Sequence, residues 1–137
     1  MPSAHGTPTA TTLADYRNRY ALYKSDPGLQ ASHAAFPWMV TWDDHEVLNN
    51  WSASRDLSAD DRYAEKSVPL LAARANRAFH EMTPVRYAPA EPGRVYRRIA
   101  YGPLLDVFFV DLRSYRGPNT AVPGAELTDA TRILGAD

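Results

Sequence analysis

The sequence predicts an α/β fold, because helix-forming stretches alternate with short runs rich in β-branched and aromatic residues. The helix-forming stretches are 13–24 and 67–82, and the strand-like runs are 38–42, 95–101 and 104–112. Two of these runs end directly in polar residues, and ligand sites of open α/β sheets form at such strand ends. The 137 residues suffice for one domain with a modest core.

The composition excludes several classes of protein. With 15 basic and 16 acidic side chains, the chain has no broad basic surface for nucleic acid or anionic lipid. Without cysteine it forms no disulfide, thiolate metal site or cysteine nucleophile. No apolar run approaches the roughly 18 to 20 residues that cross a bilayer, and the N-terminus lacks the layout of a secretory signal peptide. We therefore expect a soluble chain whose localisation its sequence leaves open.

The N-terminal part predicts a flexible lead followed by two helices. Residues 1–12 are rich in Ser, Thr, Pro, Gly and Ala and have no apolar period. Thr12 is suited to cap a helix that ends near Lys24, before turn-forming residues. A short helix over 29–35 is expected next. Spacings of three and four predict one core-facing stripe on the first helix, formed by Leu13, Tyr16, Tyr20 and Tyr23.

The middle of the chain predicts a buried strand and the main helix. Residues 38–42 are short, aromatic and β-branched, which favours a strand. The main helix is expected over 67–82, with Pro69 in its first turn, where proline is tolerated. Its expected buried residues are Leu70, Leu71, Ala75, Ala78 and Phe79.

The C-terminal part predicts an antiparallel strand pair. Residues 95–101 and 104–112 flank a Gly-Pro turn. The second run is almost continuously apolar, which predicts burial on both faces. A last helix is expected to begin near Asp129, with Thr128 as its cap.

Residues 42–51 hold the densest group of chemically active side chains. Three carboxylates, an imidazole and two carboxamides lie between two tryptophans. Hard divalent cations prefer oxygen ligands, and histidine moves protons near neutral pH. Adjacent side chains diverge in a turn after a strand, so two or three of them at most can face one metal. The same residue types also cap helices and form turns, so the chemistry alone leaves both interpretations open.

Residues 36–51 resemble the hallmark segment of the PhoD-like alkaline phosphatases. In that family a Pro-Trp strand runs into Trp-Asp-Asp-His-Glu and then Asn-Asn-Trp, as it does here. Residues 16–30 and 95–116 resemble the flanking helix and paired strands of the family. The resemblance covers about 15–135 and identifies the chain as a central fragment, with 13–137 as the central portion of a PhoD-like metallophosphoesterase domain.

The resemblance implies a fold and an activity. The family belongs to the calcineurin-like metallophosphoesterases, so the expected fold is part of a two-sheet sandwich with flanking helices. The implied function is metal-dependent hydrolysis of a phosphate ester, as an alkaline phosphatase or phosphodiesterase, with calcium and iron as cofactors. Asp44 would be a metal ligand, Asn49 a further ligand, and His45 the catalytic residue that stabilises the phosphoryl group or protonates the leaving oxygen.

The sequence departs from the family pattern in what it lacks. The cysteine-bearing segment, the Gly-Asp strand end and the later histidine loops of the family are absent, and the chain has only four histidines. We therefore expect an incomplete metal site, an inactive isolated chain, and the remainder of the phosphatase domain as a partner. The alternative is a non-catalytic α/β module that binds a cation or a partner. Family members are commonly secreted or periplasmic.

Several neighbouring residues have an ordinary structural interpretation. Asp43 is expected to form a salt bridge or cap the backbone, and Glu46 to fix His45 or a nearby backbone amide. Trp42 and Trp51 are expected to pack in the core.

Two arginines suit a phosphate group. Arg113 and Arg116 are candidate substrate-binding residues, because guanidinium groups match the geometry of phosphate. The alternative for them is a salt bridge with Asp106 or Asp111.

Overall fold

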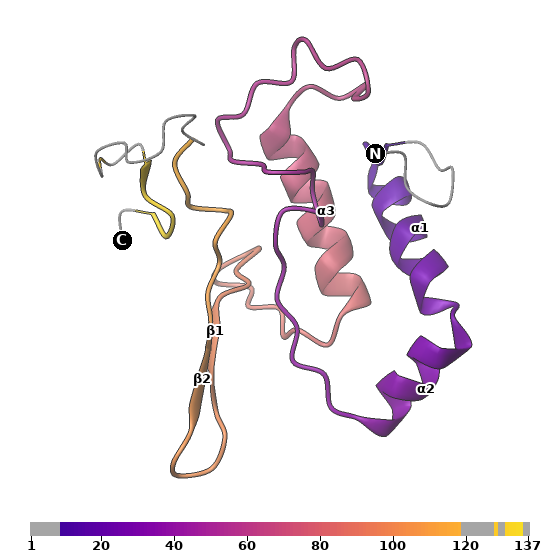
Figure 1. Cartoon of the computed structure of the whole chain (residues 1–137), viewed down its shortest axis with the longest axis vertical. Coiled ribbons are helices and arrows are strands. Elements are labelled where there is room, and N and C mark those ends of the chain that lie inside the picture. Colours follow the sequence, from indigo (N-terminus) through magenta and orange to yellow (C-terminus); the bar gives the residue numbers. More distant parts are fainter. Residues whose placement is uncertain (1–8, 119–127, 129–130, 136–137) are drawn as a thin grey trace.

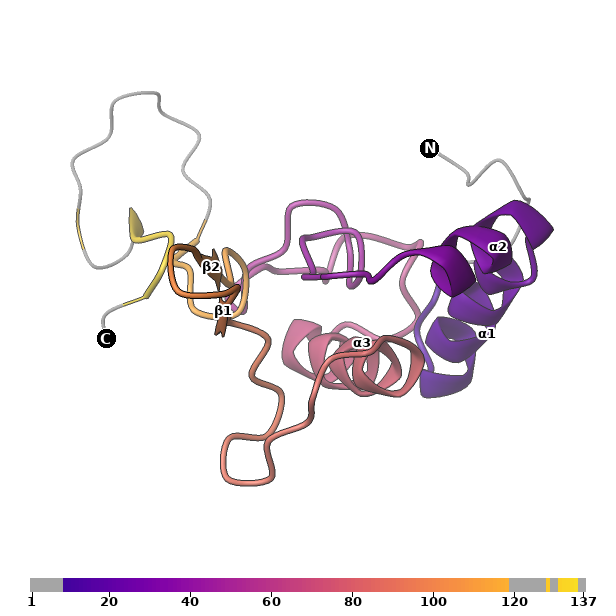
Figure 2. The same ribbon diagram turned by 90° about the horizontal axis from the view of Figure 1, so that it is seen from below.

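The computed structural model describes residues 9–118, 128 and 131–135. Within these ranges, three helices precede a two-stranded sheet, so the chain has an α/β fold. Figure 1 shows the first and third helices side by side. Figure 2 shows the sheet on the opposite side of the third helix from the other two. The elements are α1 (Leu13–Lys24), α2 (Pro27–Ala35), α3 (Val68–Met82), β1 (Arg97–Ala100) and β2 (Asp106–Phe109).

Local capping fixes the two N-terminal helices. Thr12 and Asp15 form a capping box at the start of α1, with each side chain bonded to the backbone of the other. Helix α2 begins at Pro27, two residues before the predicted start, because Asp26 accepts a hydrogen bond from the Leu29 amide and proline fits a first turn.

The tyrosine stripe predicted on α1 is only partly buried. Tyr16 is 5% exposed and Tyr20 packs against the core, but Tyr23 is 51% exposed. Tyr23 lies in the last turn of α1, and the prediction was wrong for this residue.

Helix α3 carries the main apolar face, as predicted. Ser67 caps it, and Pro69 lies in its first turn. Leu70 is 40% exposed, so its predicted burial was wrong. The neighbouring Leu71 shares a face with the residues four, seven and eight positions later, and Leu70 is rotated away from that face. The buried residues are Val68, Leu71, Ala75, Ala78 and Phe79.

The strand predicted over 38–42 does not form. These residues pair with no strand in the described part of the chain, and Trp38 and Met39 are 42% and 49% exposed. Two other contacts hold the segment in place. The Trp38 indole donates to the Ser32 carbonyl at 3.3 Å, and Arg97 donates to the Val40 carbonyl at 2.5 Å.

The predicted antiparallel pair is confirmed, with shorter strands than expected. Arg97 pairs with Phe109 and Ala100 with Asp106. Gly102 has φ 71°, a left-handed value that glycine adopts without strain, in the turn between the strands. The predicted burial of both faces of β2 was wrong, because Phe108 is 68% exposed. On the other face, the Arg97 guanidinium lies 4.2 Å from the Phe109 ring centroid.

The core lies among α1, α3 and the loop segment 42–63. Neither β1 nor β2 contributes a residue to it. The described helices are all too short or too polar to cross a membrane. Residues 1–8 of the expected lead lie outside the described ranges, as do 129–130 and 136–137 of the expected last helix, and 131–135 contain no α-helix. The core residues are Tyr16, Trp42, Val47, Leu48, Trp51, Leu57, Tyr63, Val68, Leu71, Ala75, Ala78, Phe79, Val85 and Val95.

Candidate functional site

The polar residues of 43–50 lie on a tight turn anchored in the core. The amides of Val47 and Leu48 both donate to the Asp44 carbonyl at 2.9 Å. The side chains of Val47 and Leu48 are buried, at 6% and 4% exposed. Asn50 closes the turn with φ 53°, a left-handed conformation that asparagine adopts more readily than most residues. The apolar residues thus hold the turn against the core, and His45, Asn49 and Asn50 remain exposed at its surface.

Asp44 is the buried carboxylate of this turn. It is 7% exposed, and its Oδ2 accepts a hydrogen bond of 2.6 Å from the Asn50 amide. Arg113 Nη2 lies 3.8 Å from the same oxygen. Burial alone would raise the pKa of Asp44, but the Asn50 amide and the charges of Arg113 and His45 outweigh it and lower that pKa below its ordinary value. Asp44 is therefore an anion at neutral pH.

His45 and Asn49 lie beside Asp44 on the exposed side of the turn. His45 Nε2 donates to Asn49 Oδ1 at 2.9 Å, because a carboxamide oxygen only accepts. The same Nε2 is 3.9 Å from Asp44 Oδ2. The His45 side chain is 74% exposed. The structure therefore brings the three residues together, with the imidazole open to solvent.

Arg113 follows the end of β2 and contacts the turn that carries His45. Its Nε donates to Asp43 Oδ1 at 2.6 Å, so the predicted salt bridge of Asp43 is confirmed. The partners expected for Arg113 were wrong. Asp106 pairs with Arg98 at 2.9 Å, and Asp111 Oδ1 accepts from the backbone amides of Arg113 and Ser114 instead.

The other predicted neighbours divide into packing and positioning residues. Glu46 accepts a hydrogen bond of 2.8 Å from the Asp43 amide, one of its two predicted roles. Trp42 and Trp51 are buried with ring centroids 5.7 Å apart, edge to face, so their predicted packing is confirmed. No described contact joins Arg116 to the turn, and its Nε is buried without a partner among the described residues.

The turn offers the types of oxygen ligand that a hard cation prefers, but too few of them to complete its coordination. Asp44 and Asn49 offer the carboxylate and carboxamide oxygens that calcium prefers. Within the described ranges, however, no three His, Asp or Glu side chains form a group that could hold a metal. Calcium takes about six to eight oxygen ligands, more than these side chains offer.

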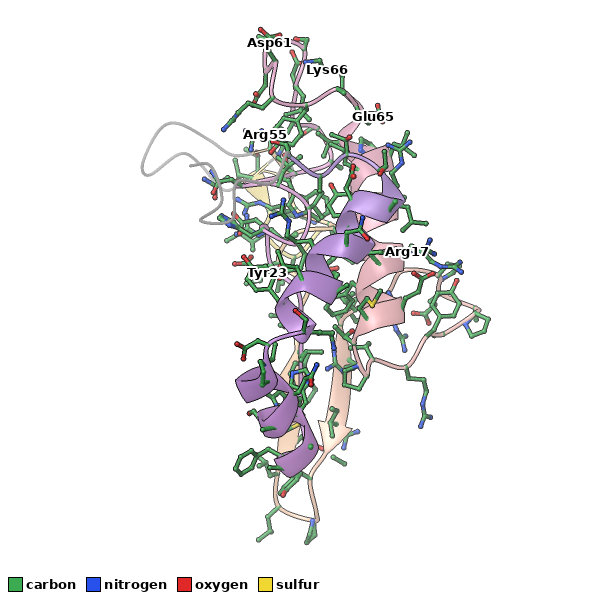
Figure 3. The ribbon with its side chains drawn as sticks, turned by 90° about the vertical axis from the view of Figure 1, so that its right-hand side faces the viewer. Arg17, Tyr23, Arg55, Asp61, Glu65 and Lys66 are labelled. Atoms are coloured by element: carbon green, nitrogen blue, oxygen red, sulfur yellow. The ribbon has the colours of Figure 1, made fainter. Side chains whose placement is uncertain are left out.

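Arg55 is a neighbour of the site that sequence reasoning missed. Its Nη1 donates to the backbone carbonyl of Asn49. Figure 3 shows Arg55 at the base of the loop that carries Asp61 and Lys66 at its tip. It borders a hollow of about 330 Å³, and no spacing in the sequence links it to the turn. The hollow is lined by Asn49, Asn50, Ser52, Arg55 and Pro118.

A carboxylate, an imidazole and a carboxamide on one anchored turn have the chemistry to bind a cation and to move a proton, the two tasks of a metal-dependent hydrolase. Comparison with known families gives the particular family. The sequence model of the PhoD-like phosphatases matches residues 2–137. The chain belongs to the PhoD-like phosphatase family.

Two relatives agree with this membership. Alkaline phosphatase D of Bacillus subtilis (strain 168) is 41% identical over 115 residues, which are 82% of this chain. A solved structure of PhoD is 36% identical and superposes on 96% of this chain with a TM-score of 0.78. The chain spans 19% of the first relative and 26% of the second.

Proposed function

We propose that this chain contributes the Asp-His-Asn part of the active site of a metal-dependent phosphoester hydrolase. The observation that carries the proposal is the approach of His45 Nε2 to Asn49 Oδ1, at 2.9 Å, and to Asp44 Oδ2, at 3.9 Å. Membership of the PhoD-like phosphatases supports it, because their name describes phosphatases. The substrate class is a phosphate ester, and calcium and iron remain the metals proposed from the resemblance.

Asp44 and Asn49 are the proposed metal-holding residues of this chain. The lowered pKa of Asp44 keeps it anionic, which a ligand of a divalent cation requires. A bound metal would neutralise charge on the phosphoryl oxygens and activate a water. Asn49 Oδ1 now accepts from His45, so it would have to turn from the imidazole to act as a ligand.

His45 is the proposed catalytic residue. Its exposure of 74% leaves the imidazole accessible to a substrate, and its Nε2 proton is held at a defined atom by Asn49. A protonated imidazole in this place can donate a hydrogen bond to a phosphoryl oxygen or a proton to the leaving oxygen. While Asn49 accepts from Nε2 it orients the ring, and the Nδ1 proton of the imidazolium is the one free to be donated.

Arg113 and Arg116 are the proposed substrate-binding residues, and their surroundings differ. Arg116 has a buried Nε without a partner among the described residues, so its N–H is available to donate a hydrogen bond to a substrate oxygen. Arg113 is 13% exposed and is paired with Asp43, so phosphate would have to displace that carboxylate. Of the two, the surroundings favour Arg116.

We further propose that 13–137 form the central portion of a larger PhoD-like domain and part of its two-sheet sandwich. The remaining metal ligands would come from that larger domain, as the partial donor set of the turn suggests. The isolated chain is then expected to be inactive. A non-catalytic cation- or partner-binding module is the alternative, and the experiment below separates the two.

The test is a chimera in which this chain replaces the matching segment of the Bacillus subtilis enzyme. Its hydrolysis of p-nitrophenyl phosphate is measured with added calcium and iron. His45→Ala is expected to lower turnover by about 10²- to 10⁴-fold, the usual contribution of a general acid. The control is His33→Ala, because His33 is an exposed histidine on α2 whose ring contacts Trp38.

Two outcomes would contradict the proposal. Unchanged turnover of the folded His45→Ala chimera would remove the catalytic role of His45. Turnover by the isolated chain would contradict the expectation that its site is incomplete. If the folded chimera lacks activity although the parent enzyme is active, the non-catalytic alternative is favoured. Circular dichroism of each chimera establishes that it is folded.

A further inference from the structure

The charge of Arg55 is among those that lower the pKa of Asp60, but the two side chains form no salt bridge. Of the described residues, none forms a salt bridge with Arg55, and its side chain contacts the Asn49 carbonyl. The nearby Asp60 is bound by Arg62 through two hydrogen bonds of 2.8 and 2.7 Å. Arg113, by contrast, is neutralised by Asp43. A guanidinium has five N–H donors, so most of those of Arg55 are available to a ligand.

The hollow beside Arg55 has the lining of an anion site. Of its five described lining residues, Arg55 carries the only charge, and Asn49, Asn50 and Ser52 are neutral and polar. No carboxylate lines the hollow in the described part of the chain. Ser52 is 2% exposed, so one lining residue of the hollow is packed into the interior of the chain. An anion there would meet the positive charge of Arg55 and no carboxylate among the described lining residues.

The hollow and the proposed catalytic group lie on different sides of Asn49. The Asn49 carboxamide accepts from His45, whereas its backbone carbonyl accepts from Arg55. A ligand of His45 and a ligand of Arg55 would therefore be neighbours separated by a single residue. This places the hollow next to the reacting phosphoryl group, on the side where another part of a substrate would extend.

We infer that Arg55 determines specificity, by binding an anionic group of the substrate other than the phosphoryl group that reacts. The preferred substrates are phosphate esters that carry a second negative charge on the leaving group, such as a carboxylate or another phosphate. This inference rests on the proposed function, since it names the ligand as a substrate of the same site. The bidentate geometry of guanidinium suits both kinds of anion.

The test measures binding to the whole 137-residue chain by NMR, in the presence of calcium. The probes are 4-carboxyphenyl phosphate and its methyl ester, which are nearly the same in shape but differ in one charge. The free acid is expected to bind about tenfold more tightly, the effect of a hydrogen bond to a charged group. Its binding should shift the Arg55 Nε resonance and the Asn50 and Ser52 amides, and added salt should reduce the preference.

Variants test whether Arg55 causes the preference for the free acid over its methyl ester. Arg55→Gln is expected to abolish the tenfold difference, and Arg55→Lys to keep part of it, because lysine retains the charge without the fork geometry. Arg86→Gln is the matched control, because Arg86 is an exposed arginine that does not line the hollow. If Arg55→Gln fails to fold, the comparison of the two probes on the natural chain and on Arg55→Lys still decides.

The outcomes separate the two proposals. Equal affinity for acid and ester in the natural chain, or a preference that survives in Arg55→Gln, overturns the role of Arg55. Failure of both probes to bind overturns it as well. If the acid binds at Arg55 while neither probe shifts the His45 and Asn49 resonances, the anion site stands, and the role of His45 is decided by the chimera instead.

Discussion

Arg113 and Asp43 are 70 residues apart in the chain, and their side chains meet at 2.6 Å between Nε and Oδ1. The same guanidinium lies 3.8 Å from Asp44 Oδ2. The end of the hairpin is thereby tied to the turn that carries His45. The Asp43 side chain is 65% exposed, so solvent screens its pair with Arg113, whereas Arg113 and Asp44 are 13% and 11% exposed and are screened less.

Arg113→Gln is expected to destabilise the chain by about 1–3 kcal/mol, because it leaves a buried carboxylate with fewer charged partners. It should also raise the pKa of Asp44, since Arg113 is one of the groups that lower it. Urea denaturation and NMR titration of the carboxylate measure the two effects. Arg86→Gln serves as control and should change neither. An unchanged Asp44 pKa in Arg113→Gln would show that the pair is not formed in solution.

Asp44 should make stability depend on pH in the acid range. Burial opposes its charged form, but the Asn50 amide and nearby positive charges lower its folded pKa below the value of about 3.9 expected in the unfolded chain. Its stabilising effect is thus present above about pH 4 and is lost as pH falls through the folded pKa.

Asp44→Asn mimics the protonated carboxyl group. The variant should have a lower free energy of unfolding than the natural chain, and this difference should shrink as pH falls from about 5 to 2. Denaturation of both proteins across this range measures the difference. Asp60, whose pKa a side-chain hydrogen bond from Arg62 lowers to about 2, affects both proteins equally. A difference that is the same at every pH would contradict the assignment of the pH dependence to Asp44.

Trp51 should tolerate phenylalanine far better than alanine. Trp51→Ala removes a ring that is 2% exposed and packs on Trp42, and it should cost about 3–5 kcal/mol. The Trp51 indole nitrogen is buried without a partner among the described residues, so Trp51→Phe loses packing volume but no hydrogen bond. Thermal unfolding ranks the variants. Equal losses for both would contradict the packing contribution assigned to the aromatic ring.

Asn50 should prefer glycine to alanine. Both substitutions remove the side chain, so their difference isolates the backbone conformation at φ 53°. Alanine is strained there, whereas glycine is not, although glycine also gains freedom in the unfolded chain. Asn50→Gly is therefore expected to be more stable than Asn50→Ala by up to about 1 kcal/mol. The reverse order in urea denaturation would argue against the left-handed turn.

The helices were predictable from the sequence because their determinants are local. Thr12 and Ser67 cap the helices that they were expected to begin, and the face of α3 follows from its apolar spacing. The strand expected over 38–42 does not form, since a strand requires a partner and composition alone does not supply one. The exposed Phe108 likewise shows that apolar residues in a run do not establish what covers them.

The residues of the candidate site could be predicted from the sequence, but their contacts with distant side chains could not. Asp44, His45 and Asn49 lie within six residues, so one turn brings them together. The partner of Arg113 is distant in sequence, and nothing in the chain distinguishes Asp43 from Asp106 as its acceptor. Arg55 reaches Asn49 only because residues 49–55 fold back on themselves, which no periodic pattern encodes.

No residue of β1 or β2 lies in the core, so the hairpin should open locally at a lower free energy than α3 does. Opening the outer end of the hairpin, near Gly102, exposes little new apolar surface. Opening α3 exposes Leu71 and Phe79. Backbone amides of the two strands should therefore exchange with deuterium well before those of α3, in a local fluctuation that leaves the helices intact. Since Arg113 lies shortly after the end of β2 at Phe109, such fluctuations would weaken its salt bridge with Asp43 and make the anchoring of the turn intermittent.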